Sequence, residues 1–169
     1  MLSWDEEDYL NKIPEDKVVK IFPYSKEIEG IVEEITNKIS SVLPKLKVKH
    51  MGASSLKMSG QGDVDIYIFS NQKDFDKYKP VLVRIFGNPK SEKYDSIAWK
   101  FEDKNHEVEL YLTDPTSIPM QRQMKVFEIL RDDLILRKEY EELKANMNGK
   151  TFKEYQRKKY EFYHKILDK

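Results

Sequence analysis

The chain has 169 residues, a usual length for one domain, and 39% of them are hydrophobic, which is enough to form a core. Its 30 Lys and Arg residues balance its 30 Asp and Glu residues, so the net charge favours neither nucleic-acid nor membrane-surface binding. The absence of cysteine excludes disulfides, zinc–thiolate sites and thiol catalysis. Because the N-terminus lacks a signal-peptide pattern and no apolar run is long enough to span a bilayer, we expect a cytoplasmic protein without a membrane partner.

A single domain is expected over residues 1–169, since the chain has no internal repeat and no low-complexity linker. Residues 1–17 form a lead-in, irregular or briefly helical up to Pro14. Ser25 then provides the N-cap of a helix that ends before Pro44. The apolar residues of this helix recur at the spacing of one helix face: Ile28, Ile31, Val32, Ile35, Ile39 and Val42.

Two strands are predicted on either side of a loop rich in glycine and serine. Residues 46–50 alternate apolar side chains with lysines, which is typical of a strand. In residues 63–69 successive side chains point to opposite faces. One face holds Val64, Ile66 and Ile68, and the other holds Asp63, Asp65 and Tyr67.

The middle of the chain predicts a helix and a pair of strands. Residues 74–86 have the pattern of a helix, with Gly87 as its stop. Residues 96–102 and 106–114 alternate like strands, and the three residues between them suit a hairpin. On the second of these strands Glu109 lies on the polar face.

The remaining residues, 120–169, are predicted to be helical. One continuous helix is expected over residues 120–147, and a last helix follows with Thr151 and Glu154 as its capping box. The order of elements predicts an α/β (α+β) fold with a small mixed sheet, helices on one face and a C-terminal helical hairpin.

Asp63 and Asp65 carry the strongest chemical signal in the sequence. They project in parallel from one strand, and two anions that close repel each other unless a cation lies between them or one is protonated. Hard oxygen ligands of this kind suit Mg²⁺ or Mn²⁺, which take their remaining ligands from water and substrate phosphates. Glu109, and less so Glu107, lies on the right face to complete a two-metal site. The alternative is an exposed strand whose acids are only solvated.

The stretch "GASS", just upstream of the acids, suits phosphate binding. Gly52 lets the backbone approach a phosphate closely, and the amides and hydroxyls of Ser54 and Ser55 are suitable donors. Lys57 lies within reach of the same loop. The preceding His50 either contacts a phosphate or forms a structural hydrogen bond.

A glycine-serine turn followed by Asp-apolar-Asp-apolar on a strand resembles the signature of the nucleotidyltransferase superfamily. More narrowly, residues 18–167 resemble the GrpB family (UPF0157-like). The stretches that match are residues 23–24, 50–54, 64–66 and 130–131, and the pairs Tyr140/Lys144 and Tyr155/Lys158. The chain departs from the family at Ala53, where relatives have serine, and at Phe127, where they usually have arginine.

Asp63 falls where GrpB relatives often have an apolar residue, which gives this chain the fuller two-carboxylate motif of the wider superfamily. The carboxylates and the superfamily resemblance together lead us to expect a metal-dependent nucleotidyltransferase that moves a nucleotidyl group from a nucleoside triphosphate to an unknown hydroxyl-bearing acceptor. We assign metal binding and catalysis to Asp63, Asp65 and Glu109 on the positions of these carboxylates. Two alternatives stay open. One is a non-catalytic protein of the same fold that binds a nucleotide or a phosphorylated metabolite. The other is a nucleic-acid or protein interaction module that uses the C-terminal helices, with the cations Arg157, Lys158 and Lys159 as its contacts.

Overall fold

Five strands form one mixed sheet in the order β1-β2-β5-β4-β3, which confirms the predicted small mixed sheet and adds β3, a strand that the sequence did not predict. The structure is a computed structural model that describes residues 1–168. Lys169, which the prediction includes in the C-terminal helices, lies outside the described residues. Strands β2 and β5 are parallel, whereas the other neighbours are antiparallel. The strands are β1 (Lys47–Met51), β2 (Val64–Phe69), β3 (Ser91–Lys93), β4 (Ser96–Asp103) and β5 (His106–Thr113).

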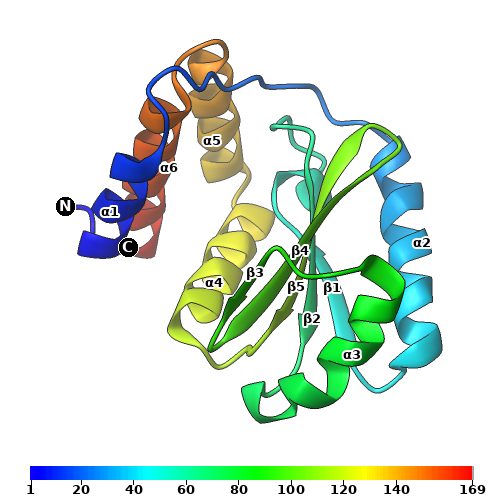
Figure 1. Cartoon of the computed structure of the whole chain (residues 1–169). Coiled ribbons are helices and arrows are strands. Elements are labelled where there is room, and N and C mark those ends of the chain that lie inside the picture. Colours follow the sequence, from blue (N-terminus) through cyan, green and yellow to red (C-terminus); the bar gives the residue numbers. More distant parts are fainter. Residues whose placement is uncertain (169) are drawn as a thin grey trace.

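Helices α2 (Glu27–Val42) and α3 (Phe75–Phe86) cover one face of the sheet (Figure 1). The main core lies between them and the sheet, and the strands contribute Val64, Ile66, Ile68, Ile97, Trp99, Val108, Leu110 and Leu112. The alternation predicted for β2 is therefore confirmed. The prediction that the Ser25 side chain caps α2 is wrong, because the N-cap is Lys26 and no side chain caps this end.

Helix α4 (Ile118–Asp132) covers part of the opposite face of the sheet (Figure 1). There Met120 packs with Met51 and Tyr67, and the rings of Tyr67 and Tyr111 stack with centroids 4.9 Å apart. The sequence predicts helices on one face of the sheet only. Helices α2 and α3 do pack on one face, but α4 also covers part of the other face. The acids of β2 and β5 lie on this second face.

The predicted continuous helix over residues 120–147 is wrong, because the chain breaks at Asp133 into α4 and α5 (Leu134–Met147). The backbone of Asp133 is extended, and its carboxylate accepts hydrogen bonds from the amides of Ile135 and Leu136 at 2.9 Å. The Arg137 side chain donates to the carbonyl of Leu130 at the end of α4. Asp133 thus caps the start of α5, and Arg137 satisfies a carbonyl at the end of α4. Together they stabilise the break, although the sequence on both sides of it favours helix.

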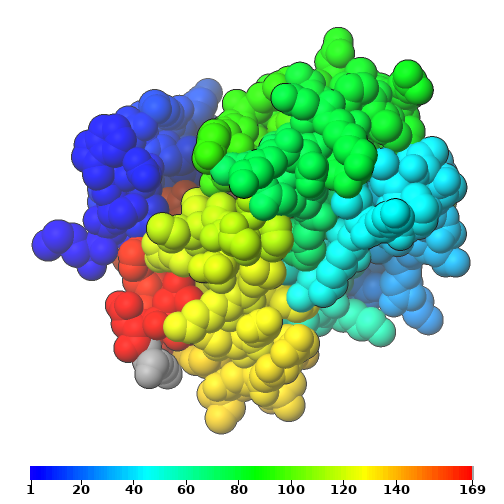
Figure 2. Space-filling view, turned by 90° about the horizontal axis from the view of Figure 1, so that it is seen from below, coloured from blue at the N-terminus to red at the C-terminus, as the bar shows by residue number. Residues whose placement is uncertain are grey.

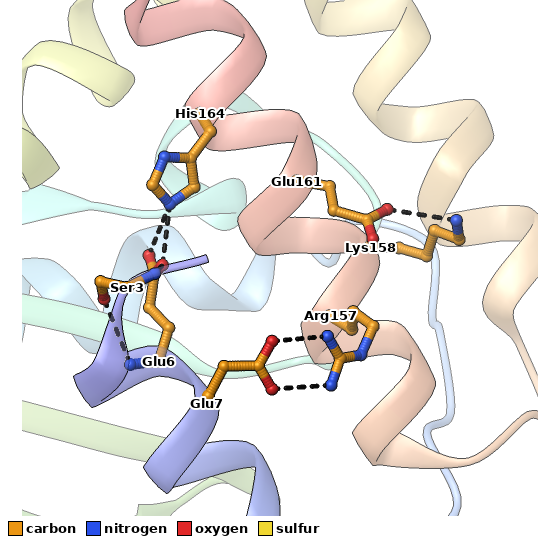
Figure 3. Close-up of polar contacts among 7 residues, drawn as sticks. All are labelled: Ser3, Glu6, Glu7, Arg157, Lys158, Glu161 and His164. Carbon is orange, nitrogen blue, oxygen red and sulfur yellow. Dashed lines mark hydrogen bonds and ion pairs between the residues drawn. The ribbon is translucent and has the colours of Figure 1, made fainter. Parts of the chain in front are cut away.

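Helix α6 (Phe152–Leu167) returns along α5, and the lead-in forms α1 (Trp4–Lys12) against α6. Figure 2 shows the N-terminal segment beside the C-terminal helix. The contact includes a two-point ion pair between Glu7 and Arg157, with both N–O distances 2.9 Å. The Glu6 carboxylate also accepts hydrogen bonds from His164 Nε2 (Figure 3). Within residues 1–168 no helix combines the length and apolar character needed to cross a membrane.

Candidate functional site

Strand β2 presents its acids on the face away from the main core. Val64 and Ile66 are fully buried in that core, so the intervening Asp65 points to the other side of the sheet. In the parallel register, Asp65 lies directly beside Glu109 of β5. Asp63 immediately precedes β2, on the same side as Asp65. The sheet therefore brings together the three carboxylates that the sequence singled out.

The environment of Asp65 disfavours its charge. Burial raises the pKa of this carboxyl well above its usual range, and repulsion from Asp63 and Glu109 raises it further. Burial also raises the pKa of Asp63, although the positive charge of Lys159 opposes the rise. Two carboxylates that repel each other in a partly dry site favour a bound cation or a retained proton.

Glu109 contributes to the acid group while it is held by other partners. The Tyr111 hydroxyl donates to Glu109 Oε2 at 2.6 Å, and Lys100 Nζ lies 3.6 Å from Glu109 Oε1. Across residues 1–168 there is no group of three or more His, Cys, Asp or Glu side chains placed to hold a metal ion. Asp63 and Asp65 fit the needs of Mg²⁺, because this ion commonly takes one or two protein carboxylates and completes its octahedron with water and phosphate oxygens.

The turn after β1 lies against the Asp65 carboxylate. Gly52 has a φ of +84°, and a Cβ placed on it would lie 2.5 Å from Asp65 Oδ2. Both the backbone conformation and the available space therefore require glycine here. The short helix Ala53–Leu56 follows directly, so the start of the turn and the acid strand form one continuous wall.

The other residues predicted to bind phosphate have local partners. A hydrogen bond of 2.9 Å joins Ser54 Oγ to His50 Nε2, and the Ser55 hydroxyl donates to the Gly52 carbonyl at 2.7 Å. Lys57 is exposed, with its Nζ 3.7 Å from Glu29. Gly52 lies beside the acids, whereas the Ser54 and Ser55 hydroxyls are engaged within the turn and Lys57 is paired elsewhere.

A cavity of about 70 Å³ lies between this wall and the C-terminal helices. We name it the acid–lysine cavity, because it is lined by Gly52, Asp63 and Asp65 from the sheet side and by Lys144 and Lys159 from α5 and α6. Since one water needs roughly 10–15 Å³ of such space, the cavity has room for several waters or a phosphate-sized group.

Both lysines have an unusual environment. Lys144 is 1% exposed, its Nζ donates to the Ser59 carbonyl, and burial lowers its pKa to about 8. The pKa of Lys159 is raised, first by the Tyr163 side chain and further by Tyr155, Asp63 and Asp65. A cation held opposite two carboxylates gives the cavity both signs of charge.

The role of Lys159 was missed in the sequence, although a signal is present. The buried stripe of α6 is Phe152, Tyr155, Phe162 and Ile166, and Lys159 occupies the position that completes this spacing. Lys144 likewise continues the buried stripe of α5, since it lies one turn after Tyr140 and two turns after Leu136. A lysine inside an apolar stripe is expensive to bury without a partner and therefore marks a candidate site.

The three cations proposed for an interaction module do not share one surface. Arg157 is paired with Glu7, and Lys158 Nζ lies 3.1 Å from Glu161 (Figure 3). Lys159 instead lines the acid–lysine cavity. The arrangement gives little continuous basic surface for a nucleic acid.

The mixed sheet, the glycine turn before an acid-bearing strand and the helical end define an α+β domain with a small mixed sheet. A family model described as GrpB protein matches residues 18–169, and the chain therefore belongs to the GrpB family, as its sequence motifs indicate. A UPF0157 protein of Vibrio cholerae serotype O1 is 25% identical over 146 residues, which are 85% of this chain and 78% of that protein.

Two solved structures match the chain, and the first is similar in fold. The conserved protein GrpB from Enterococcus faecalis matches with a TM-score of 0.59 and 18% identity, over 75% of this chain and 81% of that one. The Cid1 poly(U) polymerase with bound MgGTP matches with a TM-score of 0.47 and 10% identity, over 78% of this chain and 43% of that one.

Most of the helical residues that support the resemblance converge on the acid–lysine cavity. Leu130, Tyr140, Lys144 and Tyr155 line it, and so do Ala53 and Phe127, the two positions where the chain departs from the family. Two of the matching residues lie elsewhere, since Arg131 is paired with Asp132 and Lys158 with Glu161. At Phe127 the cavity therefore has an apolar wall in place of a cation.

Proposed function

We propose that this protein transfers a nucleotidyl group from a nucleoside triphosphate to a hydroxyl-bearing acceptor, with Mg²⁺ or Mn²⁺ as cofactor. One observation carries the proposal: Asp63 and Asp65 face Lys144 and Lys159 across a single cavity. Carboxylates suit the metal of a metal–triphosphate complex, and lysines suit its phosphate oxygens. Neither set alone distinguishes this function from simple anion binding or cation binding.

Each residue has a role that follows from its place. Lys159 and Lys144 neutralise the β- and γ-phosphates, and the backbone at Gly52 allows the triphosphate to lie close to the acid strand. When bound by Asp63 and Asp65, a divalent cation supplies charge neutralisation and activation of the acceptor hydroxyl. Glu109 lies beside Asp65 and, through Tyr111 and Lys100, fixes the far side of the acid group.

The transfer exchanges one bond to phosphorus for another. The acceptor's hydroxyl oxygen forms a bond to the α-phosphorus, and the bond from that phosphorus to the oxygen bridging the α- and β-phosphates breaks. Diphosphate leaves with the electron pair, next to the two lysines, and the hydroxyl proton passes to a carboxylate of the acid group. Positioning and electrostatic stabilisation supply most of the catalysis in reactions of this class.

A second candidate is a non-catalytic protein that binds a nucleotide or a phosphorylated metabolite in the same cavity. The engagement of Glu109 by Tyr111 and Lys100 favours it, because a third carboxylate would complete a two-metal site only if it were released. The absence of a hydroxyl at Ala53 points the same way. The two candidates differ in whether binding depends on a divalent cation.

A thermal-shift screen tests the proposal. The four nucleoside triphosphates are added with and without Mg²⁺ or Mn²⁺ to the wild-type protein and to Asp65→Asn. At a concentration a hundredfold above the dissociation constant, binding adds about 2.7 kcal/mol, or roughly 5–10 °C for a domain of this size. We expect at least one metal-dependent shift in the wild type and none in Asp65→Asn.

Asp76→Asn is the matched control, since Asp76 is exposed at the start of α3, away from the cavity. It should respond like the wild type. A shift that needs no metal and survives Asp65→Asn would favour the non-catalytic candidate. If no triphosphate shifts the melting temperature with any metal, the proposed function is wrong.

A further inference from the structure

A second and larger cavity, of about 510 Å³, lies on the other side of the loop that precedes β2. We name it the outer cavity. Its walls are residues 22–28, the loop over residues 58–63 and the end of the β4–β5 hairpin over residues 102–107. Its volume falls within the range of roughly 300–1,000 Å³ typical of small-molecule sites.

The three walls of the outer cavity are tied to one another. Phe22 and Gly60 exchange two backbone hydrogen bonds, of 2.7 and 3.0 Å, which join the first wall to the loop. His106 Nδ1 forms a 2.8 Å hydrogen bond with the Gly62 carbonyl, which joins the loop to the hairpin. His106 Nε2 lies 3.5 Å from Glu27, so the same ring also reaches the first wall. The cavity is therefore held open by a connected frame.

The outer cavity shares part of its lining with the acid–lysine cavity. Ala53, Met58, Gly60, Gln61 and Asp63 line both. Asp63 thus lies between a space that holds two lysines and a space on the opposite side. A group-transfer site needs this arrangement, in which donor and acceptor approach the same carboxylates from two directions.

The two cavities differ sharply in charge. The acid–lysine cavity has two lysines against two aspartates, which suits an anion together with its metal. Four carboxylates line the outer cavity, those of Glu27, Asp63, Glu102 and Glu107, against the single lysine Lys104 and His106. Lys100 pairs with Glu107 at 2.7 Å, whereas Glu102 has no ion-pair partner within residues 1–168. The apolar side chains of Ile28 and Met58 also line the outer cavity, and both are almost fully buried.

The geometry points to the outer cavity as the acceptor site of the proposed transfer, and to a small hydroxyl compound that carries a positive charge, such as an amino alcohol or an amino sugar, as its occupant. The assignment rests on the proposed function, because it takes Asp63 to be part of the reacting centre. The cation lies against the acidic rim, the carbon skeleton lies against Ile28 and Met58, and the hydroxyl points to Asp63. A nucleic-acid acceptor is disfavoured, because its phosphates would face four carboxylates.

Methyl NMR of the six methionines gives a direct test that needs no nucleotide. The Met58 methyl reports the two cavities, and Met147, which packs in a separate cluster with Leu10, is an internal control. The probes are pairs that differ mainly in charge: choline against 3,3-dimethylbutan-1-ol, and glucosamine against glucose. We expect the Met58 signal to move with the cationic member of each pair, at a concentration about tenfold lower than with its neutral partner, while Met147 stays fixed.

The double variant Glu102→Gln/Glu107→Gln removes two charges from the rim and leaves Asp63 in place. We expect it to lose the preference for the cationic probes. Glu142→Gln, on the exposed face of α5, should behave as the wild type. If the neutral members move Met58 as readily as the cations, if no cation moves it, or if the double variant keeps the preference, the assignment is wrong.

The same titration separates this inference from the proposed function. Because no triphosphate is present, binding of the cationic probes does not depend on whether the acid–lysine cavity takes a nucleotide. Adding a short RNA oligonucleotide instead of the small probes completes the test. Movement of Met58 with RNA but not with the cations would also contradict the assignment.

Discussion

The two faces of the sheet come from the same strands and differ in almost everything else. Toward α2 and α3, β2 presents Val64, Ile66 and Ile68, all fully buried among apolar neighbours. Toward the C-terminal helices, the same strand presents Asp65 and Tyr67. One residue of shift along β2 therefore separates the side that stabilises the fold from the side proposed to carry chemistry.

The difference extends to how each face treats titratable groups. On the apolar face, His50 lies opposite Ile66, and burial lowers its pKa to about 4, so the ring is neutral at physiological pH. On the other face, burial and mutual repulsion raise the pKa of Asp65 while charges of both signs remain close by. The titratable group on the first face, His50, is neutral. The second face keeps charged side chains, whose charges a bound ligand can neutralise.

The largest expected effect is on the apolar face, at Trp99. This side chain is 1% exposed, and its indole N–H donates to the Gly87 carbonyl at 2.9 Å. Trp99→Ala should lower the free energy of unfolding by about 3–5 kcal/mol in urea titrations. On the second face, Tyr111→Phe removes only a hydroxyl from Glu109 and should cost about 1 kcal/mol. If the two variants lowered the free energy of unfolding equally, the apolar face would not contribute more to stability than the second face.

The pH dependence of stability sharpens the comparison through His50. Its folded-state pKa lies below its usual value, so the unfolded chain binds the proton more readily. The associated stability is fully present above about pH 6.5 and is lost as the pH falls toward about 4. The loss is at most about 3 kcal/mol. His50→Gln keeps a polar group near Ser54 and should weaken this pH dependence, as measured by urea titrations at pH 7, 5.5 and 4. An unchanged pH dependence would contradict the claim that His50 causes the loss of stability at acid pH.

Two glycine substitutions are expected to change stability less than Trp99→Ala does, and with opposite signs. Gly52→Ala places a Cβ 2.5 Å from Asp65 Oδ2 at a φ of +84° and should cost about 1–3 kcal/mol. Gly30→Ala, in α2, meets nothing within 4 Å and should stabilise the protein by up to about 1 kcal/mol. Thermal unfolding measures both. If Gly52→Ala is as well tolerated as Gly30→Ala, the close contact between the turn and Asp65 is not real.

The apolar face could be predicted from the sequence because alternation and helical spacing are local signals. The positions of β2, β4 and β5 follow from such patterns, as does the placement of Asp65 and Glu109 on the polar faces of their strands. Their direct proximity depends on the parallel pairing of β2 with β5. The break at Asp133 was missed because the composition on both sides is helical, and only a side-chain cap separates α4 from α5. The short strand β3 was missed because three exposed residues give no periodicity.

The cavity was harder to predict than the sheet, because residues far apart in the sequence form it. Asp63 and Asp65 are close in sequence, and their spacing marks them. Lys159 lies on α6, and its direction depends on how three helices pack around the end of the sheet. The spacing of the buried residues of α6 is the local signal for Lys159, because the lysine occupies a position within that stripe.

The central claim is that the acids of the sheet and the lysines of the helices bind one metal–triphosphate complex. Calorimetric titration of Mg²⁺ and inorganic triphosphate tests it without knowledge of the base. We compare the wild type with Asp65→Asn, Lys159→Met and the exposed neighbour Lys158→Met. The account predicts at least about tenfold weaker binding, or about 1.4 kcal/mol, for each of the first two variants and no change for Lys158→Met. Binding that is equal in all four proteins, or absent from the wild type, would contradict it.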